Sequence, residues 1–334
     1  MKQSEEKVLA GAKVLVVGGA GYIGAHTCQA LAKAGFVPVV LDTLETGYRE
    51  FVQWGPLVQG DCADPQVVAD VLAQYQPVAV LHFAAKISVP ESEQNPQLYY
   101  EHNVVKTLAF LRTLLAYQLI PVIFSSTAAV YGNPIQTPIE EDHPLLPINP
   151  YGRTKLMVES ILADYHKAYG LPSICLRYFN AAGADPEAQI GEVHDPETHL
   201  IPLVLRATDT HPIKVFGTDY PTPDGTCIRD YIHVCDLASA HVAALHFILS
   251  TSGAYHMNLG TGEGASVLAV IQAAEAVLGR PVPHEFHARR DVDPAILVAS
   301  AALSRSVLGW TPQRSDLKTI IEDALRWAGQ SHLK

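Results

Sequence analysis

Short apolar runs rich in β-branched residues alternate with longer stretches of helical periodicity through the first half of the chain. Five of these runs are predicted strands: Lys13–Val17, Val37–Leu41, Val78–His82, Val122–Ser125 and Ser173–Arg177. Strands separated by helices pair in parallel through right-handed crossovers, which cover both faces of the sheet. The pattern therefore predicts the α/β class, with a doubly wound parallel sheet of the Rossmann type.

After about Phe179 the alternation changes to Pro- and Gly-rich connections, including the turn at residues 220–225. Regular structure is predicted again at Val234–Leu249 and Tyr255–Leu259. We expect a first domain over residues 1–180, which the chain rejoins around 232–260. Residues 181–334 are expected to form mainly a smaller, loop-rich C-terminal domain.

Two long helices are predicted at about Pro96–Gln118 and Gly152–Tyr169. Apolar side chains such as Val104 and Leu108 in the first, and Leu162 in the second, recur at near-helical spacing. These helices either only cover the sheet or also face a second subunit, and the pattern favours neither.

Composition and charge narrow the classes of partner. The 334 residues are 48% hydrophobic, enough for a full α/β core, and the formal net charge is −11. So acidic a chain offers no general surface to nucleic acid or anionic membranes, and a phosphate-bearing ligand must be held by a few arginines and backbone amides. The sequence has no apolar stretch of bilayer-spanning length, and its first residues lack the apolar region of a secretory signal.

The cysteines and histidines indicate neither disulfides nor a metal. The chain has no Cys-x-x-Cys pair, which in a chain of this length indicates reduced thiols and a cytoplasmic location. Its five cysteines are Cys28, Cys62, Cys175, Cys227 and Cys235. His194, His199 and His211 follow no ligand spacing such as His-Glu-x-x-His, so we expect surface histidines and no metal ion.

A glycine-rich turn directly follows the first predicted strand and opens a helix. It reads Gly18-Gly19-Ala20-Gly21-Tyr22-Ile23-Gly24. Glycines there let backbone N–H groups approach a pyrophosphate, whose charge is favoured by the helix N-terminus. Asp42 ends the second strand, where a carboxylate accepts hydrogen bonds from an adenosine ribose and repels a 2′-phosphate, so NAD is favoured over NADP. Asp61, within Gly60-Asp61-Cys62, either holds the adenine amino group or caps the helix near Pro65.

Tyr151 and Lys155 stand four residues apart at the start of a predicted helix and so share one face. A tyrosine is a poor base at neutral pH, and lowering its pKa by about three units needs roughly 4 kcal/mol of cation stabilisation. Lys155 and an oxidised nicotinamide together are suited to supply it. Thr127, within Ser125-Ser126-Thr127 at the end of a predicted strand, either relays a hydrogen bond from substrate to Tyr151 or merely caps the turn.

These motifs resemble the extended short-chain dehydrogenase/reductase family. Over nearly the whole length the chain is similar to the UDP-glucose 4-epimerases of that family. The similarity rests on longer strings at residues 80–85, 151–159, 176–180 and, most specifically, 219–234. It implies a homodimer in which bound NAD takes the C4 hydride of UDP-glucose or UDP-galactose while Tyr151 removes the hydroxyl proton. The 4-keto sugar then turns over and takes the hydride back. Residues 1–180 would bind NAD and 181–334 mainly the UDP-sugar.

The resemblance also implies roles for individual residues. Tyr151, Lys155 and Thr127 would be catalytic. The cofactor would meet Gly18, Gly21, Tyr22, Ile23, Gly24, Asp42, Asp61, Cys62, Phe83, Ala84, Ala85, Asn103, Ser125, Tyr151, Lys155 and Tyr178. The substrate would meet Thr127, Tyr151, Asn180, His199, Leu200, Arg229, Arg290 and Asp293. Planar guanidiniums suit the diphosphate, although Arg290 in a solvated or intramolecular pair is the alternative.

Three positions depart from the family pattern. A lysine that often lies near the nicotinamide falls one residue early here, at Lys86, and Ile87 takes its place. His199 replaces a common asparagine at the uridine diphosphate. Ile296 matches a family position that lines the sugar pocket, and its intermediate bulk leaves open whether an N-acetylated sugar fits. UDP-pentoses and UDP-glucuronate share the same nucleotide, so the sequence does not distinguish them as substrates either.

Two alternative functions require residues or constraints that differ from those of an epimerase. A nucleotide-sugar dehydratase needs an acid/base group after the Ser/Thr, where this chain has Ala128 and Ala129. A non-catalytic NAD sensor would have no use for Tyr151, Lys155 and Thr127 together. An epimerase is therefore the favoured hypothesis.

Overall fold

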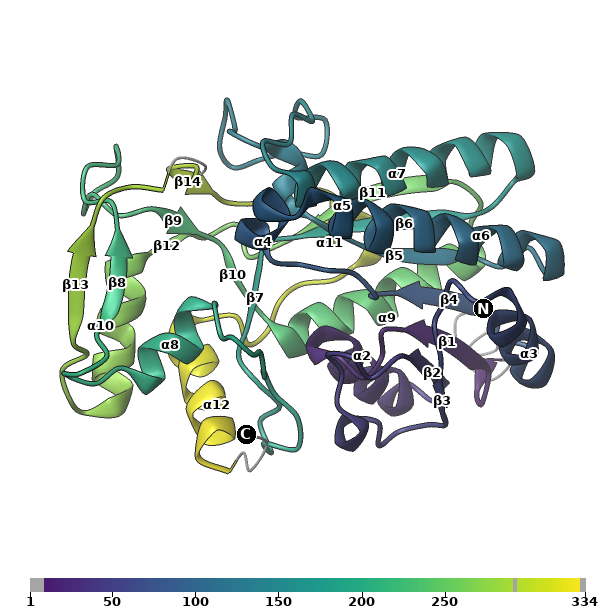
Figure 1. Cartoon of the computed structure of the whole chain (residues 1–334), viewed down its shortest axis with the longest axis horizontal. Helices are drawn as coiled ribbons and strands as arrows, with labels where there is room; N and C mark the ends of the chain where they lie inside the picture. The colour runs from purple at the N-terminus through teal and green to yellow at the C-terminus, as the bar shows by residue number, and fades with distance from the viewer. Residues whose placement is uncertain (1–8, 291–292, 331–334) are drawn as a thin grey trace.

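A seven-stranded sheet forms the centre of the protein (Figure 1), in a computed structural model that describes residues 9–290 and 293–330. Its order is β11-β6-β5-β4-β1-β2-β3, and every neighbouring pair is parallel. The strands are β1 (Lys13–Val17), β2 (Val37–Asp42), β3 (Leu57–Gln59), β4 (Ala79–His82), β5 (Val122–Thr127), β6 (Ser173–Tyr178) and β11 (Ala254–Leu259). The predicted doubly wound sheet is confirmed, with strand ends within two residues of those expected.

Helices cover both faces of this sheet, because side chains of each strand point alternately to either side. Val14 and Val16 of β1 lie in one core, and Leu15 and Val17 lie in the other. The first core is covered by α2 (Tyr22–Lys33), α9 (Val234–Ser250) and α11 (Ala302–Leu308). The second is covered by α3 (Pro65–Tyr75), α6 (Lys106–Tyr117) and α7 (Pro150–Tyr169).

The helix expected over Pro96–Gln118 is interrupted. After α4 (Val89–Gln94) the chain forms α5 (Pro96–Tyr99), then a π-helical turn at Tyr100–Val105, and only then α6. Apolar periodicity does not reveal a π-turn, which inserts one extra residue without changing the residue types. α7 begins at Pro150, two residues before the prediction, because the Asn149 side chain accepts the Gly152 N–H at 2.8 Å and so caps it.

The remaining elements form a smaller lobe beside the end of the sheet from which β7 (Asn180–Ala182) leaves (Figure 1). β7 pairs with β10 (Tyr231–His233), β8 (Ile213–Phe216) with β13 (His284–His287), and β9 (Ile228–Arg229) with both β12 (Ala265–Ser266) and β14 (Ile296–Leu297). Its helices are α8 (Leu200–Arg206), α10 (Val267–Leu278) and α12 (Leu317–Gln330), which share a third core. Short 3₁₀ turns lie at Arg49–Phe51 and Ala128–Tyr131.

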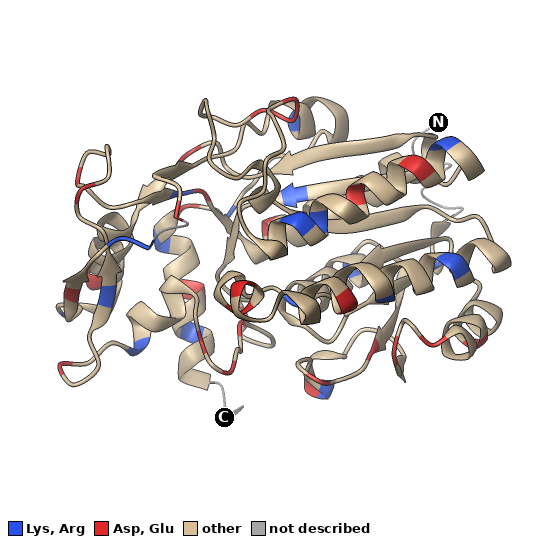
Figure 2. Ribbon diagram, turned by 45° about the horizontal axis from the view of Figure 1, so that its top comes forward, with Lys and Arg blue, Asp and Glu red and all other residues tan. Residues whose placement is uncertain are grey.

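The outer surface carries charges of both signs. Figure 2 marks acidic and basic positions interspersed along the ribbons of the outer helices. Within the described ranges, no helix combines the length and the apolarity that crossing a bilayer requires.

Candidate active site

The glycine turn after β1 closes against two other backbone segments. Gly18 has φ +81°, and a Cβ there would stand 2.6 Å from the Ala84 nitrogen, two residues after β4. A Cβ on Gly24, in the first turn of α2, would stand 2.3 Å from the Gly18 oxygen. Only glycines permit this approach. It brings the N-terminus of α2 to the carboxyl ends of β1 and β4, the two neighbouring strands between which the strand order of the sheet reverses. The cradle thus fits a pyrophosphate.

Asp42 anchors the same turn. Its carboxylate accepts the Ala20 N–H and the Leu44 N–H, each at 2.9 Å. Each oxygen keeps a lone pair, so the carboxylate remains able to accept a ribose hydroxyl.

Asp61 is not the cap of α3; Asp64 is, accepting the Gln66 N–H at 2.8 Å. Asp61 instead accepts the Ala63 N–H at 2.8 Å and pairs with Lys106 at 2.6 Å. Partial burial is the largest single influence and opposes ionisation, but the hydrogen bonds from Lys106 and the Ala63 N–H, together with the Lys106 charge, outweigh it and lower the pKa of Asp61. The ion pair leaves Asp61 a fixed acceptor beside the cradle, and Lys106 is a partner that the sequence interpretation missed.

The α7 N-terminus presents Tyr151 and Lys155 to the end of β5. The Lys155 ammonium, whose residue is 1% exposed, donates to the Ser125 carbonyl oxygen at 2.8 Å and lies 5.9 Å from the centre of the Tyr151 ring. Thr127 accepts the Ala129 N–H at 3.2 Å, so it caps the following turn, and its hydroxyl lies near enough to the Tyr151 phenol to lower the pKa of that phenol. The structure therefore brings the three predicted catalytic residues together.

The chain by itself does not make Tyr151 a base. Burial raises the pKa of Tyr151 to about 12, and the nearby Thr127 hydroxyl offsets this only in part. Burial lowers the pKa of Lys155 to about 7. The lowered phenol pKa expected from the sequence thus needs a further positive charge, which an oxidised nicotinamide ring provides.

A layer of buried and half-buried side chains lies under this site. The hydroxyls of Ser125 and Tyr178 hydrogen-bond each other, and the rings of Phe83 and Tyr178 both pack on His241, at 4.9 and 5.8 Å between ring centres. Other predicted cofactor residues lie at the same edge of the sheet: Gly21, Tyr22 and Ile23 at the start of α2, Cys62 after β3, and Ala84 and Ala85 after β4.

Asn103 lies in the π-turn and has both amide hydrogens occupied. They go to the Lys86 carbonyl oxygen and the Thr154 hydroxyl, each at 3.0 Å, while the Asn103 oxygen accepts the Lys86 N–H at 2.8 Å. The Lys86 ammonium pairs with Glu45 at 3.2 Å. Asn103 thus holds the loop after β4 in place, and the role of Lys86 seen here is to link that loop to the loop after β2.

A buried ion pair behind the catalytic residues was not anticipated. Arg177 of β6 donates to both carboxylate oxygens of Glu159, at distances from 2.6 to 3.2 Å, and both side chains are at most 3% exposed. Ser126 donates a further hydrogen bond to the same carboxylate. Glu159 follows Lys155 by four residues, so helical spacing was the one signal that placed it on this face.

Three predicted substrate residues meet in the smaller lobe. The Asp293 carboxylate lies 3.4 Å from the Arg229 guanidinium and 4.0 Å from that of Arg290, which stacks on Phe216. Two guanidiniums and one carboxylate leave one positive charge, so an anion is favoured beside them. Arg290 is therefore both intramolecularly paired and half exposed.

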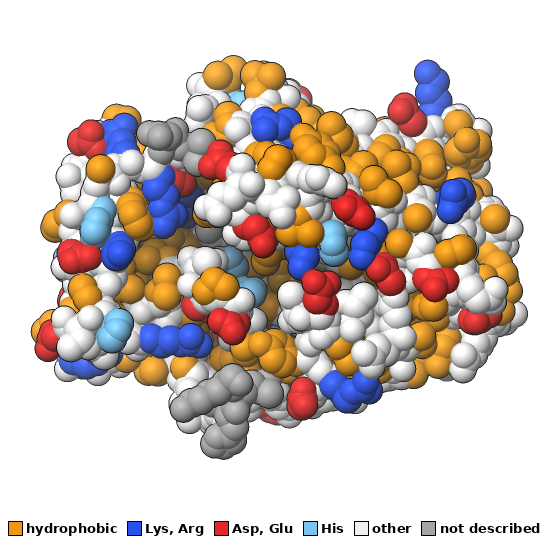
Figure 3. Space-filling model, viewed as in Figure 1, with side chains coloured by type: hydrophobic (Ala, Val, Ile, Leu, Met, Phe, Trp, Pro, Cys, Tyr) orange, Lys and Arg blue, Asp and Glu red, His pale blue; other side chains and the backbone are white. Residues whose placement is uncertain are grey.

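The other predicted substrate residues lie on the segments that join the lobe to the sheet. Asn180 is exposed at the start of β7, Leu200 begins α8, and His199 precedes it. The His199 Nδ1 faces Glu192, which leaves Nε2 free to face a ligand. Figure 3 shows the surface hollowed between the two lobes, with histidine side chains exposed there.

Comparisons with known proteins agree with this geometry. Residues 14–260 match the model of the NAD dependent epimerase/dehydratase family. A UDP-glucose 4-epimerase of Rhizobium leguminosarum bv. trifolii is 51% identical over 326 residues, 97% of this chain and 99% of the relative. The crystal structure of UDP-glucose 4-epimerase from Brucella ovis in complex with NAD matches with a TM-score of 0.91 and 49% identity, covering 94% of this chain and 98% of that one. The UDP-Glc/GlcNAc 4-epimerase of Campylobacter jejuni matches with a TM-score of 0.84 and 39% identity, over 96% of this chain and all of its own.

Proposed function

Because the chain belongs to the NAD-dependent epimerase/dehydratase family, and within it to the UDP-glucose 4-epimerases, we propose that it interconverts UDP-glucose and UDP-galactose through a 4-keto intermediate. The observation that carries the proposal is the meeting of Tyr151, Lys155 and Thr127 at the carboxyl edge of the sheet, beside a glycine cradle that a single Cβ would fill.

The side chains divide the work of proton transfer. Bound NAD supplies what no side chain can, namely acceptance of the C4 hydride and its return. Tyr151 removes the C4 hydroxyl proton and, after the sugar has turned so that the other face of C4 is presented, returns a proton to the same oxygen. Thr127 aligns the phenol with that hydroxyl, and Lys155, fixed by the Ser125 carbonyl, favours the phenolate.

The smaller lobe would hold the nucleotide while the sugar turns. Arg229 and Arg290, with one net positive charge after pairing with Asp293, would bind the diphosphate, and Asp293 the uridine ribose. We accordingly assign NAD binding to residues 1–180 with the return at 232–260, and UDP-sugar binding mainly to residues 181–334. A diphosphate anchored away from C4 leaves the hexose free to present either face.

Incubation of the purified chain with UDP-galactose, followed by proton NMR, tests this function. We expect UDP-glucose to accumulate to a fixed ratio without added NAD, and the same ratio from the opposite direction. A chain that carries bound NAD and converts neither sugar would overturn the proposal.

A second question is which UDP-sugars the enzyme accepts. Ile296 lies on β14 and pairs with Ile228 of β9, the residue that precedes Arg229. One matched relative is named as acting on both UDP-Glc and UDP-GlcNAc. The same NMR assay with UDP-N-acetylhexosamines, UDP-pentoses and UDP-glucuronate distinguishes an enzyme of broad range from a hexose-specific one.

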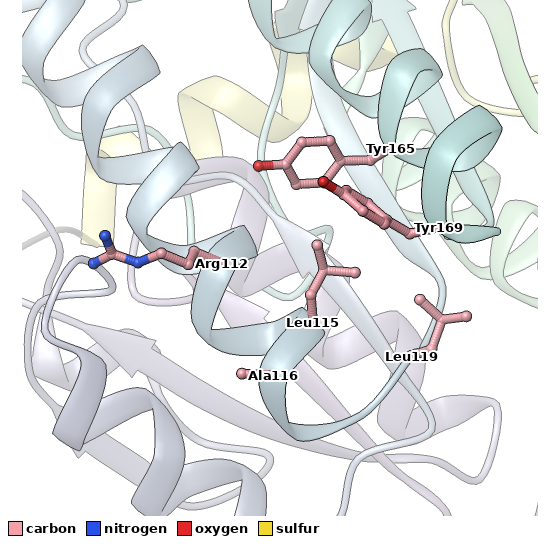
Figure 4. A pocket seen from close by; sticks show the side chains of 6 residues that line it. All are labelled: Arg112, Leu115, Ala116, Leu119, Tyr165 and Tyr169. Atoms are coloured by element: carbon pink, nitrogen blue, oxygen red, sulfur yellow. The ribbon is translucent and has the colours of Figure 1, made fainter.

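We further propose a homodimer formed through α6 and α7. Tyr117, Leu119 and Tyr169 are about half exposed there. A groove between the helices is lined by Arg112, Leu115, Ala116, Leu119, Tyr165 and Tyr169 (Figure 4). Contiguous exposed apolar side chains favour burial against a second copy.

Light scattering with size-exclusion chromatography tests the dimer. Leu119→Glu is expected to give monomers, whereas Leu303→Glu, at an exposed apolar position on α11, leaves the mass unchanged. A wild-type monomer at all concentrations would refute the assembly.

Five free cysteines also favour our proposal of a cytoplasmic location, which cell fractionation checks.

A further inference from the structure

Four side chains that can bind a metal converge on the loop between β7 and α8. They are Glu192, His194, Glu197 and His199, and the ligand atoms that they offer all lie within 4.8 Å of one another. The His194 Nδ1 lies 3.3 Å from the Glu192 Oε1 and 3.5 Å from the Glu197 Oε1, and the His199 Nδ1 contacts the same Glu192 oxygen. Two imidazoles and two carboxylates thus face a common point.

The spacing around the His194 Nδ1 matches that of a metal site. Ligand atoms at ~2.0–2.2 Å from a tetrahedral zinc ion lie about 3.3–3.6 Å from one another. The two distances from the His194 nitrogen fall in or at this range. The contact between His199 and Glu192 is shorter, and an ion that replaced the hydrogen-bonding proton between them would separate the two atoms.

Burial and charge point the same way. The side chains of Glu192 and Glu197 are 5% and 4% exposed, so two carboxylates are withdrawn from water at one place. The His194 Nδ1 and the Glu197 Oε2 are buried and find no hydrogen-bond partner among the described residues. A divalent cation bound by two neutral imidazoles and two carboxylates forms a site with no net charge. Coordination of the ion would also give the His194 Nδ1 the partner that hydrogen bonding does not provide.

The loop backbone is held so that the ligands keep their positions. The Glu197 Oε1 accepts the N–H groups of Thr198 and His199, each at 2.9 Å, and the Trp327 indole N–H donates to the Glu192 carbonyl oxygen at 3.1 Å. A Cβ on Gly191 would lie 2.4 Å from the Trp327 ring. Hydrogen bonds to a ligating carboxylate are the outer-shell support that metal sites use.

From this geometry we propose that Glu192, His194, Glu197 and His199 bind one divalent transition-metal ion of the zinc type. The histidine spacing alone predicts no metal, because Glu-x-His-x-x-Glu-x-His lies on a loop and not on one face of a helix. The site joins the loop to the dinucleotide cradle, since the His194 ring packs edge-on at 6.5 Å from the ring of Tyr22, the first residue of α2. In Figure 1 this loop hangs between α8 and α2.

Metal content and affinity of the full chain test the proposal, independently of activity. After EDTA treatment and dialysis, we expect titration with ZnCl2 to show one ion per chain, and CoCl2 to give the visible absorption of a tetrahedral site. Loss of an outer-shell partner costs about 10–100-fold in metal affinity. His194→Gln and Glu197→Gln remove ligands themselves, so each should weaken zinc binding by at least that factor.

Glu285→Gln and His287→Gln serve as matched controls, because these residues form an exposed His–Glu pair at 2.7 Å on β13. Their zinc affinity should equal that of wild type. The proposal is overturned if wild-type protein binds zinc no more tightly than the His194 and Glu197 variants, or if the control variants lose as much affinity. Circular dichroism of each variant shows whether it is folded, and the wild-type cobalt spectrum stands even if a variant does not fold.

Discussion

Lys155 reaches from α7 to the end of β5, where its ammonium donates to the carbonyl oxygen of Ser125 at 2.8 Å. That single bond fixes a cation below the phenol of Tyr151, within a site so buried that the pKa of Lys155 falls to about 7. The cause is loss of hydration on burial. The charged form of Lys155 is therefore unfavourable in free energy until anions or substrate bind nearby.

The first prediction concerns this cost. An unfolded lysine has a pKa of about 10.4, so between about pH 7 and 10.4 the unfolded chain binds more protons and stability rises with pH. Lys155→Met abolishes that contribution. We expect the free energy of unfolding of cofactor-free wild type, relative to Lys155→Met, to rise by up to about 1.4 kcal/mol per pH unit in that window. Urea denaturation at several pH values measures it, and a constant difference between the two proteins would contradict the prediction.

The second prediction concerns Tyr151. Tyr151→Phe retains the ring that lies edge-on to Tyr99 at 6.5 Å but cannot accept a proton. General acid–base groups contribute about 10²–10⁴-fold, so kcat should fall by that factor while the melting temperature stays near that of wild type. Thr127→Val should lose less, because it only orients the phenol. Full activity of Tyr151→Phe would show that another group is the base.

The third prediction concerns the ion pair between Arg177 and Glu159. Removing one partner leaves the other charge buried, so Arg177→Met should destabilise the fold by about 3–5 kcal/mol. The double variant Arg177→Met with Glu159→Leu should recover part of this loss, because neither charge remains. Thermal and urea unfolding of the three proteins checks the order, and equal stability of single and double variants would count against it.

The fourth prediction concerns the glycine cradle. Gly24→Ala would force a methyl group to within 2.3 Å of the Gly18 oxygen, which only backbone movement relieves. We expect loss of bound NAD, measured by absorbance after denaturation of the purified protein. Gly329→Ala on α12 is the control, since a Cβ there meets nothing within 4 Å, and its NAD content should match wild type. Equal NAD content in both variants would argue against the cradle.

The fifth prediction concerns the diphosphate site. A hydrogen bond to a charged group contributes about 1.5–3 kcal/mol, so Arg229→Gln should raise KM for the UDP-sugar by about 10–100-fold, with a smaller change in kcat. Arg289→Gln is the comparison, because Arg289 pairs with Asp219 and stacks on Tyr220. Its KM should change little. Similar effects at both positions would mean that the lobe acts through overall charge.

The sequence by itself determined the features that depend on neighbours along the chain. Alternating apolar runs set the sheet, because strand and helix periods are local properties. The glycines between Gly18 and Gly24 set the cradle, and the four-residue spacing of Tyr151 and Lys155 set one helix face. Such patterns require only the geometry of one strand, turn or helix.

Only the tertiary structure decided which distant side chains meet. Lys106 joins Asp61, Arg177 joins Glu159, and Arg229 joins Asp293 across 18 to 64 positions, and each pair depends on how whole elements pack. Packing also withdrew Lys155 and Tyr151 from water, which changed their pKa values in the direction opposite to a phenolate–ammonium pair. A one-dimensional pattern carries neither burial nor long-range proximity, because both arise when segments that are remote in the chain exclude water between them.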